Sequence, residues 1–143
     1  MHIKIISHRT AEYEMMIELR MALLRRPLGL TFTEEQLDAE KNDLLIAAFE
    51  NDEMTGCCVL TPIDPITIQL RQMAVKENVQ AKGIGRSIVA YAEKIAMEKG
   101  YKLIMMHARD IATGFYKKCG YQVKGDEFIE VSLPHYHMEK ELL

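Results

Sequence analysis

A short glycine-containing loop lies between the clearest strand pattern and the clearest helix pattern of this 143-residue chain. The loop reads QAKGIG, residues 80–85, and follows the apolar run ITIQLRQMAV at residues 66–75. From Ile84 onward apolar residues recur at helical spacing, and Gly100 supplies a helix stop. Glycines at such a junction serve either a turn at positive φ or the approach of an anion to free N–H groups at the helix start. We therefore expect a strand, loop and helix unit here, with its purpose decided by the surrounding residues.

The same reasoning divides the rest of the chain into strands and helices. Apolar and β-branched runs predict strands at 2–7, 43–50, 54–61, 66–75, 102–107, 121–123 and 135–140, the central three forming an antiparallel meander. Helical spacing and caps predict helices at 10–26, 33–41, 84–100 and 111–120. The expected fold class is α+β, a mixed α/β sandwich around one sheet. Residues 1–143 are expected to form a single domain, because no linker or repeat interrupts the pattern.

Charge and cysteine content limit the partners that this chain can have. The net charge is −3 and no run of Lys and Arg is longer than a pair, a pattern that disfavours a nucleic-acid partner. No apolar stretch approaches the roughly 20 residues of a membrane-spanning helix, so no membrane partner is expected. Cys57, Cys58 and Cys119 lack metal-site spacing, and the N-terminus lacks the apolar region of a signal peptide. We expect a cytoplasmic protein without a bound metal.

Two familiar phosphate-binding loops do not fit residues 80–85. A P-loop reads Gly-x-x-x-x-Gly-Lys-Ser/Thr, and a dinucleotide-binding loop needs a further glycine where Ile88 stands. What remains is an anion site at the first turn of the helix, where backbone N–H groups lack intrahelical partners. Lys82 and Arg86 lie beside these groups in the sequence. A pyrophosphate fits this arrangement, and a plain turn is the alternative.

Two segments together resemble motifs of the GCN5-related N-acetyltransferase (GNAT) superfamily. Residues 70–100 are similar to motif A, whose loop pattern Arg/Gln-x-x-Gly-x-Gly/Ala is matched by Gln80, Gly83 and Gly85. The segment HARDIATGFYKKCGYQV is similar to motif B, which is matched by Ala112, Phe115, Tyr116, Gly120 and Tyr121. Ala81 departs from a common glycine, and Gln80 replaces the more frequent arginine. The resemblance implies the GNAT fold, with a mostly antiparallel sheet of about six or seven strands and about four helices, and acetyl-CoA as cosubstrate.

The resemblance also implies which residues bind acetyl-CoA. The sheet would splay beside the strand that precedes the loop, and the pantetheine arm would pair with its edge at Met73, Ala74 and Val75. The pyrophosphate would be held by main-chain N–H groups of Gln80, Ala81, Lys82, Gly83, Ile84, Gly85 and Arg86. The N–H near Val75 would polarise the thioester carbonyl, and Tyr116 would donate a proton to the departing thiolate. A core tyrosine packed on Phe115 is the alternative for Tyr116.

No pattern identifies the group that accepts the amine proton. The strand at 66–75 carries no carboxylate, which leaves Glu127, Glu130, His107 and His135 as candidates. His107 is also interpretable as a core histidine, and a water relay would make a dedicated base unnecessary.

Other chemistry-bearing residues favour plain structural roles. His135 and His137 lack a third metal ligand nearby and are interpreted as surface histidines. Cys119 is interpreted as a packing cysteine instead of an acyl carrier. Three arginines late in the first helix complement its dipole, with attraction of an acidic acceptor as the alternative: Arg20, Arg25 and Arg26.

The expected function is direct transfer of an acetyl group from acetyl-CoA to a primary amine in a ternary complex. The acceptor is either a small amine or a protein lysine. The missing strand carboxylate supports an alternative, a non-catalytic acyl-CoA binding or sensing module. A protein-interaction domain without a cofactor is a third possibility. An exposed strand edge in the tail permits a homodimer.

Overall fold

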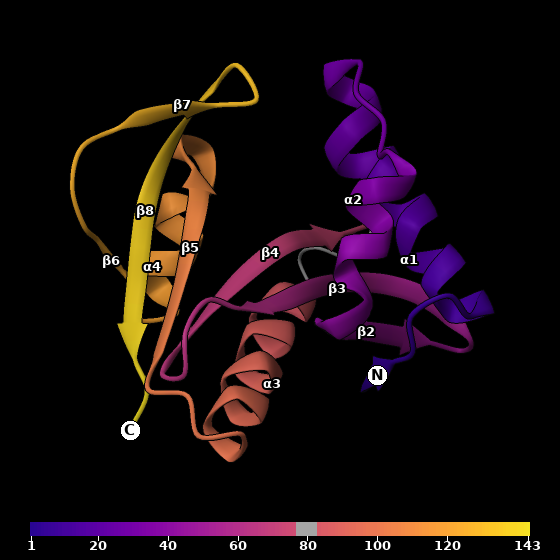
Figure 1. The fold of residues 1–143 in the computed structure, drawn as a ribbon, viewed down its shortest axis with the longest axis horizontal. Coiled ribbons are helices and arrows are strands. Elements are labelled where there is room, and N and C mark those ends of the chain that lie inside the picture. The colour runs from indigo at the N-terminus through magenta and orange to yellow at the C-terminus, as the bar shows by residue number, and fades with distance from the viewer. Residues whose placement is uncertain (77–82) are drawn as a thin grey trace.

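A single mixed sheet organises the computed structural model, which describes residues 1–76 and 83–143 (Figure 1). In these residues the sheet has eight strands in the order β1-β2-β3-β4-β5-β8-β6, with β7 paired to β8. Only β4 and β5 run parallel; the other pairs in the described residues are antiparallel. The strands are β1 His2–Ile6, β2 Leu44–Glu50, β3 Glu53–Pro62, β4 Thr67–Val75, β5 Leu103–Arg109, β6 Gln122–Val123, β7 Phe128–Glu130 and β8 Leu133–Glu141. The fold class expected from the sequence is confirmed, including the antiparallel meander of β2, β3 and β4.

Four α-helices are present in the described residues: α1 Ala11–Arg20, α2 Glu34–Asp38, α3 Ile84–Glu98 and α4 Thr113–Lys118. The first is shorter than expected, because a π turn at Met21–Arg25 and a 3₁₀ turn at Arg26–Leu28 follow it. Pro27 lies in the 3₁₀ turn and has no N–H for a helical hydrogen bond, so the α-helix cannot continue through it.

The second helix is also shorter than predicted, although its start is confirmed. The Thr33 side chain accepts a hydrogen bond from the Gln36 N–H at 3.1 Å, and the Gln36 side chain accepts one from the Thr33 N–H at 2.9 Å. This reciprocal pair is a capping box and satisfies two N–H groups at the helix start. The α-helix gives way to a 3₁₀ turn at Ala39–Asn42.

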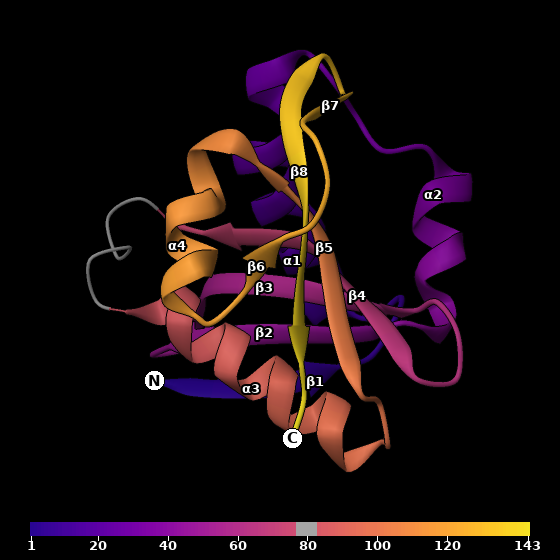
Figure 2. The ribbon, with the colours of Figure 1, turned by 90° about the vertical axis from the view of Figure 1, so that its left-hand side faces the viewer.

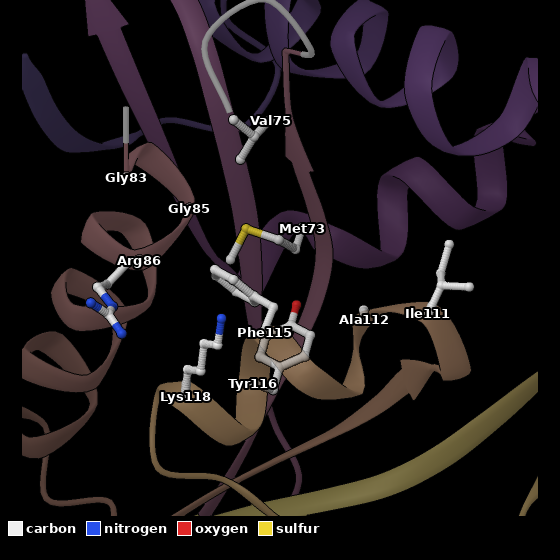
Figure 3. A pocket seen from close by; sticks show the side chains of 10 residues that line it. All are labelled: Met73, Val75, Gly83, Gly85, Arg86, Ile111, Ala112, Phe115, Tyr116 and Lys118. Atoms are coloured by element: carbon white, nitrogen blue, oxygen red, sulfur yellow. The ribbon is translucent and has the colours of Figure 1, made fainter. Parts of the chain in front are cut away.

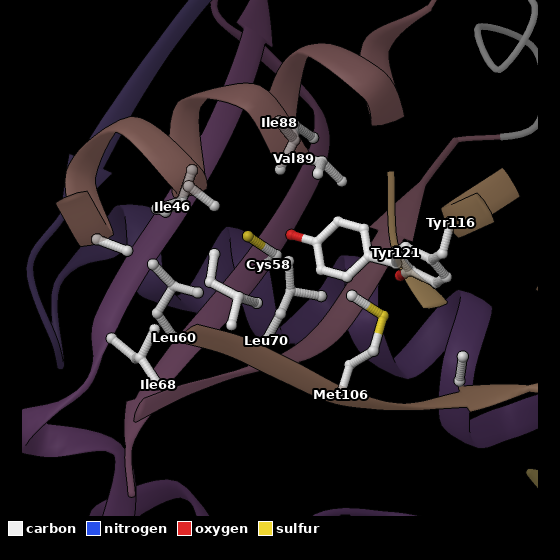
Figure 4. Packing of buried hydrophobic residues seen from close by; sticks show 14 of the residues in the cluster. Ile46, Cys58, Leu60, Ile68, Leu70, Ile88, Val89, Met106, Tyr116 and Tyr121 are labelled. Atoms are coloured by element: carbon white, nitrogen blue, oxygen red, sulfur yellow. The ribbon is translucent and has the colours of Figure 1, made fainter. Parts of the chain in front are cut away.

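Two apolar cores lie on opposite faces of the sheet, one under α1 and one under α3. Figure 4 shows residues of the core under α3. Side chains along the central strands alternate between them, as the twofold repeat of a strand requires. Cys57 faces the α1 core and Cys58 faces the α3 core, and both are fully buried. The α3 residues that fill the second core are Ile84, Ile88, Val89, Ala92 and Ala96. Burying each isoleucine of this set contributes about 1.5–3 kcal/mol.

The sheet separates between β4 and β5. Their pairing covers only Thr67 to Gln69 on β4, opposite Leu103 to Met105 on β5. Beyond these residues the two strands diverge, as Figure 1 shows. Figure 2 shows α4 beside the start of α3, with α2 on the other side of β5 and β8. The splay that the family resemblance implied is therefore present, and it opens the middle of the sheet.

The C-terminal part contains a strand that the sequence did not predict. β7 pairs with β8 through a two-residue turn, Val131 and Ser132, both at positive φ. β8 also begins earlier than expected, at Leu133. Three residues are too few to show a strand repeat, which explains why β7 was missed. In the described ranges no helix is both long and apolar enough to cross a membrane.

Candidate functional site

A pocket of about 750 Å³ lies between the end of β4, the start of α3 and α4 (Figure 3). It is lined by Met73, Val75, Gly83, Gly85, Arg86, Ile111, Ala112, Phe115, Tyr116 and Lys118. Three segments that are distant in the sequence therefore meet at one cavity. This cavity is the main candidate for a ligand site.

The start of α3 provides hydrogen-bond donors at one end of the pocket. The first helical bond runs from the Ser87 N–H to the Gly83 carbonyl at 3.1 Å. The N–H groups of Ile84, Gly85 and Arg86 precede it, so they have no acceptor within the helix. They lie at the positive end of the helix dipole, next to the Arg86 side chain that lines the pocket. This is the arrangement that binds phosphate groups at helix N-termini.

Glycine is favoured at positions 83 and 85 for different structural reasons. Gly83 has φ +74°, a left-handed conformation that other residues adopt at a cost. A Cβ on Gly85 would lie 3.2 Å from the Cζ of Phe115, across the pocket mouth. Gly83 therefore serves the turn, and the missing side chain of Gly85 leaves room for the Phe115 ring. The turn is thus confirmed for Gly83, and the approach of an anion to the helix start stays a prediction.

A β-bulge in β4 turns two side chains toward the pocket. Arg71 pairs with Val59 and Ala74 pairs with Cys57, so β4 carries one extra residue between these pairs. Gln72 lies at φ +55° within the bulge. The extra residue reverses the alternation of side chains along the strand. Met73 and Val75 consequently face the pocket, while Ala74 packs into the α1 core.

Tyr116 places a phenol at the pocket wall. Its ring is buried and packs edge to face against Phe115, with ring centroids 5.0 Å apart. Figure 3 shows its hydroxyl directed toward Met73. Burial raises the pKa of this phenol, and the nearby Cys58 and Cys119 raise it further. Tyr116 is therefore a protonated donor at neutral pH, and its hydroxyl has no hydrogen-bond partner among residues 1–76 and 83–143.

Five of the ten residues predicted to bind the cofactor line the pocket: Met73, Val75, Gly83, Gly85 and Arg86. Gln80, Ala81 and Lys82 lie outside the described residues. The Ile84 and Ala74 side chains are buried in the two cores, so only their backbone atoms are available to a ligand. Ile111 and Lys118 also line the pocket although the sequence analysis did not assign them to it. The 76% exposure of Ile111, an apolar residue, is visible only in the structure.

A second group of polar side chains lies on the other face of β5 and β8. Met106 and Met138 point into the α3 core, so the adjacent His107 and His137 point away from it. His107 Nδ1 lies 3.0 Å from Glu130 Oε1, and His135 Nε2 lies 3.7 Å from Glu130 Oε2. Three of the four candidate proton acceptors therefore converge. The fourth, Glu127, is exposed and does not join them.

Two histidine expectations were wrong. His107 is no core histidine, because its side chain is 34% exposed and contacts Glu130. His135 is no surface histidine, because its residue exposure is only 5%. Both errors arise from the β7–β8 hairpin, which covers His135 and brings Glu130 across to β5. No group of three His, Cys, Asp or Glu side chains in the described part of the chain is placed to hold a metal ion.

Arg20 is committed to a buried ion pair. Its guanidinium donates two hydrogen bonds to Glu40, at 2.8 and 2.7 Å, and Tyr13 donates a third at 2.7 Å. Both charged residues are almost fully buried. Arg20 is therefore not available to an acidic acceptor. Burial alone raises the pKa of Glu40, but the hydrogen bonds and charge of Arg20, with the Tyr13 bond, hold that pKa below its usual value.

Comparison with known proteins identifies relatives of this chain. Residues 13–121 match the model of the Acetyltransferase (GNAT) family. The uncharacterized Bacillus subtilis protein YyaT is 37% identical over 76 residues, which are 53% of this chain and 51% of YyaT. The chain spans about half the length of the curated relatives that it matches.

Solved structures show the same fold over nearly the whole chain. An aminoglycoside 6′-N-acetyltransferase complexed with coenzyme A is 18% identical with a TM-score of 0.86, covering 100% of this chain and 98% of that one. A GNAT family acetyltransferase from Elizabethkingia anophelis with acetyl-CoA bound is 23% identical with a TM-score of 0.74, covering 99% and 97%. At 18% and 23% sequence identity, the similarity shows a shared fold only.

Proposed function

Because this chain belongs to the GNAT acetyltransferase family, we propose that it transfers an acetyl group from acetyl-CoA to a primary amine. One observation carries the proposal: helix N–H groups without an acceptor in α3, a stretch of β4 not paired with β5 and a protonated phenol meet in a single pocket. Two solved proteins of the same fold have coenzyme A or acetyl-CoA bound, which supports this choice of cosubstrate. We take residues 1–143 as one catalytic domain.

The pocket residues fit the parts of acetyl-CoA in order. The diphosphate would bind the N–H groups of Gly83, Ile84, Gly85 and Arg86, because these donors lie at the positive end of α3. Gln80, Ala81 and Lys82 precede them in the sequence and would contribute further N–H groups to the proposed diphosphate site.

The pantetheine arm would lie beside β4. β5 does not pair with β4 at Met73 and Ala74, because the pairing of the two strands stops at Gln69 of β4. The extended pantetheine can pair with backbone there as an added strand does. The Met73 and Val75 side chains would enclose the arm from the pocket side.

Acetyl transfer needs an attacking neutral amine and a proton for the departing thiolate. The amine nitrogen attacks the thioester carbon, a C–N bond forms and the C–S bond breaks. Tyr116 would donate its phenolic proton to the sulfur, since burial keeps the phenol protonated and its hydroxyl faces the pocket. Acetyl donor and amine would be bound at the same time, with the amine entering through the gap between β4 and β5. A small amine or a protein lysine can be the acceptor.

The test combines binding with turnover. Calorimetry should show saturable binding of coenzyme A, and thiol release from acetyl-CoA should depend on at least one amine in a panel of polyamines, amino sugars, amino acids and lysine peptides. Tyr116→Phe should retain binding and lose about 10²-fold or more in kcat, the usual contribution of a general acid. Binding without turnover on any amine would favour an acyl-CoA sensor. No binding of coenzyme A would reject both functions.

A further inference from the structure

His107 lies next to the opening in the sheet. The parallel pairing of β5 with β4 ends at Met105, and His107 follows two residues later. Met105 and His107 share one face of β5, opposite the face that Met106 presents to the α3 core. His107 therefore borders the diverging strands on the side away from the pocket. Figure 1 shows β7 beside the carboxyl end of β5, where the distance from β4 is largest.

Glu130 determines which nitrogen of His107 carries the proton. An ionised carboxylate only accepts hydrogen bonds, so the His107 Nδ1 at 3.0 Å from Oε1 must be the N–H donor. In the neutral ring the lone pair then lies on Nε2. No residue in the described ranges forms a hydrogen bond with that nitrogen. A carboxylate that orients an imidazole in this way leaves the opposite ring nitrogen ready to accept a proton.

The buried His135 ring lies on the other side of Glu130 but, in its neutral form, makes no hydrogen bond with it. Its Nδ1 lies 2.9 Å from the Leu133 carbonyl, which only accepts, so Nδ1 is the donor and Nε2 faces Glu130 Oε2 at 3.7 Å. The ring is buried, and Glu130 pairs with Leu133 across the hairpin. The carboxylate therefore lies between two imidazoles on paired strands.

The remaining groups around His107 are few. The Phe128 ring lies edge-on with its centroid 5.1 Å away, and the His137 ring centroid is 6.1 Å away. His137 Nε2 is bound to Glu139 at 2.9 Å, and Arg109 lies further along the same face of β5. His107 is thus the member of the cluster that combines an oriented ring, a free nitrogen and access to solvent.

We propose that His107 is the base that accepts the proton of the acceptor amine, with Glu130 as its positioning residue. The inference rests on the proposed acetyl transfer. An ammonium substrate gives one proton to His107 Nε2, and the neutral amine then attacks the thioester carbon. The C–S bond breaks, the thiolate takes the Tyr116 proton, and the phenolate recovers a proton from the amide nitrogen. The overall reaction releases one proton, which leaves through His107 to solvent.

Three variants distinguish a catalytic role of His107 from a role in anchoring the β7–β8 hairpin. His107→Gln retains a side chain that can hydrogen-bond Glu130 but has no base, and should lower kcat/KM by about 10²–10⁴-fold with coenzyme A binding unchanged. Glu130→Gln should lower kcat about tenfold, because the imidazole loses the carboxylate that orients it. His137→Gln, on the same face and also paired to a glutamate, should stay within about threefold of the wild type.

Two further measurements distinguish a base from a structural tie. Free imidazole should restore part of the activity of His107→Ala but not of Tyr116→Phe. Nitrogen NMR of the wild-type protein should show the Nδ1–H form of His107, changing toward Nε2–H in Glu130→Gln. A His107→Gln variant with wild-type kcat/KM, or an Nε2–H ring in the wild type, would overturn the inference.

The proposed acetyl transfer can fail while the inference about His107 still holds. If the wild type binds coenzyme A and acetylates no amine, its slow hydrolysis of acetyl-CoA becomes the readout, because attacking water also needs a base. Hydrolysis reduced tenfold or more by His107→Gln, on the general-base scale, would support the inference without the amine transfer. Hydrolysis equal in both proteins would reject it.

Discussion

Replacing Gly83 with aspartate tests the proposed diphosphate site. A Cβ at Gly83 meets no atom of residues 1–76 and 84–143 within 4 Å, so no clash with these residues enters the result. The backbone there is left-handed, at φ +74°, and Asn and Asp are the side chains that tolerate this conformation best. Gly83→Asn is therefore a matched control that carries the same backbone cost and shape without the charge.

The magnitude follows from the position of the new charge. A carboxylate at the first turn of α3 lies about 5 Å from an anion bound to the same N–H groups, and an effective dielectric constant of about 20 gives roughly 3 kcal/mol of repulsion. Screening by solvent and salt reduces this to about 1–3 kcal/mol. We expect Gly83→Asp to bind coenzyme A about 10- to 100-fold more weakly than Gly83→Asn. The carboxylate also lies at the positive end of α3, so it should not destabilise the fold.

Isothermal titration calorimetry with coenzyme A measures this difference directly. Titrations at low and high salt should show the gap between the two variants narrowing, because screening weakens a charge effect. Circular dichroism melting confirms that both variants are folded. Equal affinities of Gly83→Asp and Gly83→Asn would refute a diphosphate at the start of α3, and with it the proposed orientation of acetyl-CoA.

Four further predictions concern the fold that supports the site. Glu40→Gln leaves the Arg20 charge buried without a carboxylate and should cost about 3–5 kcal/mol in urea unfolding at pH 7, whereas Glu18→Gln in an exposed pair with Arg26 should change nothing measurable. Because the pKa of Glu40 is lowered in the folded protein, ionised Glu40 stabilises the fold above pH 4.5, its ordinary pKa, and this stabilisation is lost as the pH falls below 4.5. The melting temperature of the wild type should therefore fall below pH 4.5, and that of Glu40→Gln should fall less. Val131 is β-branched at φ +45°, and Val131→Asn should stabilise the protein by about 0.5–1.5 kcal/mol in the same unfolding assay; no gain would mean that the turn stores no strain. Burial raises the pKa of three tyrosines, Tyr13, Tyr116 and Tyr121. Ultraviolet titration should show these three ionising only as the protein unfolds in alkali, and the free energy of unfolding should decline above about pH 10. Ionisation of all the tyrosines before unfolding would contradict their burial.

Local patterns in the sequence were sufficient for much of the fold. The Thr33 capping box, the helix from Ile84 and the meander of β2, β3 and β4 each depend on residues that are neighbours in the chain, and all three are present. The positive φ of Gly83 at the start of α3 was likewise expected from the residues next to it in the chain. The motif resemblance then linked this local unit to acetyl-CoA, and the family match supports that link.

Other features depend on residues that meet only when the sheet is assembled. The bulge at Gln72 reverses the side-chain alternation of β4, and no periodicity in the sequence shows where an extra residue will be accommodated. Arg20 finds Glu40 across a turn that also breaks the first helix.

By itself, the sequence determined the start of α3 after β4 and, apart from β7, the order of strands and helices, because both follow from the preferences of adjacent residues. Tertiary structure alone decided that Glu130 lies between His107 and His135. Those three residues come from strands β5, β7 and β8, and their contacts depend on how β8 aligns with β5 and β7. Strand register over such separations is set by packing of the whole sheet, which no local pattern encodes.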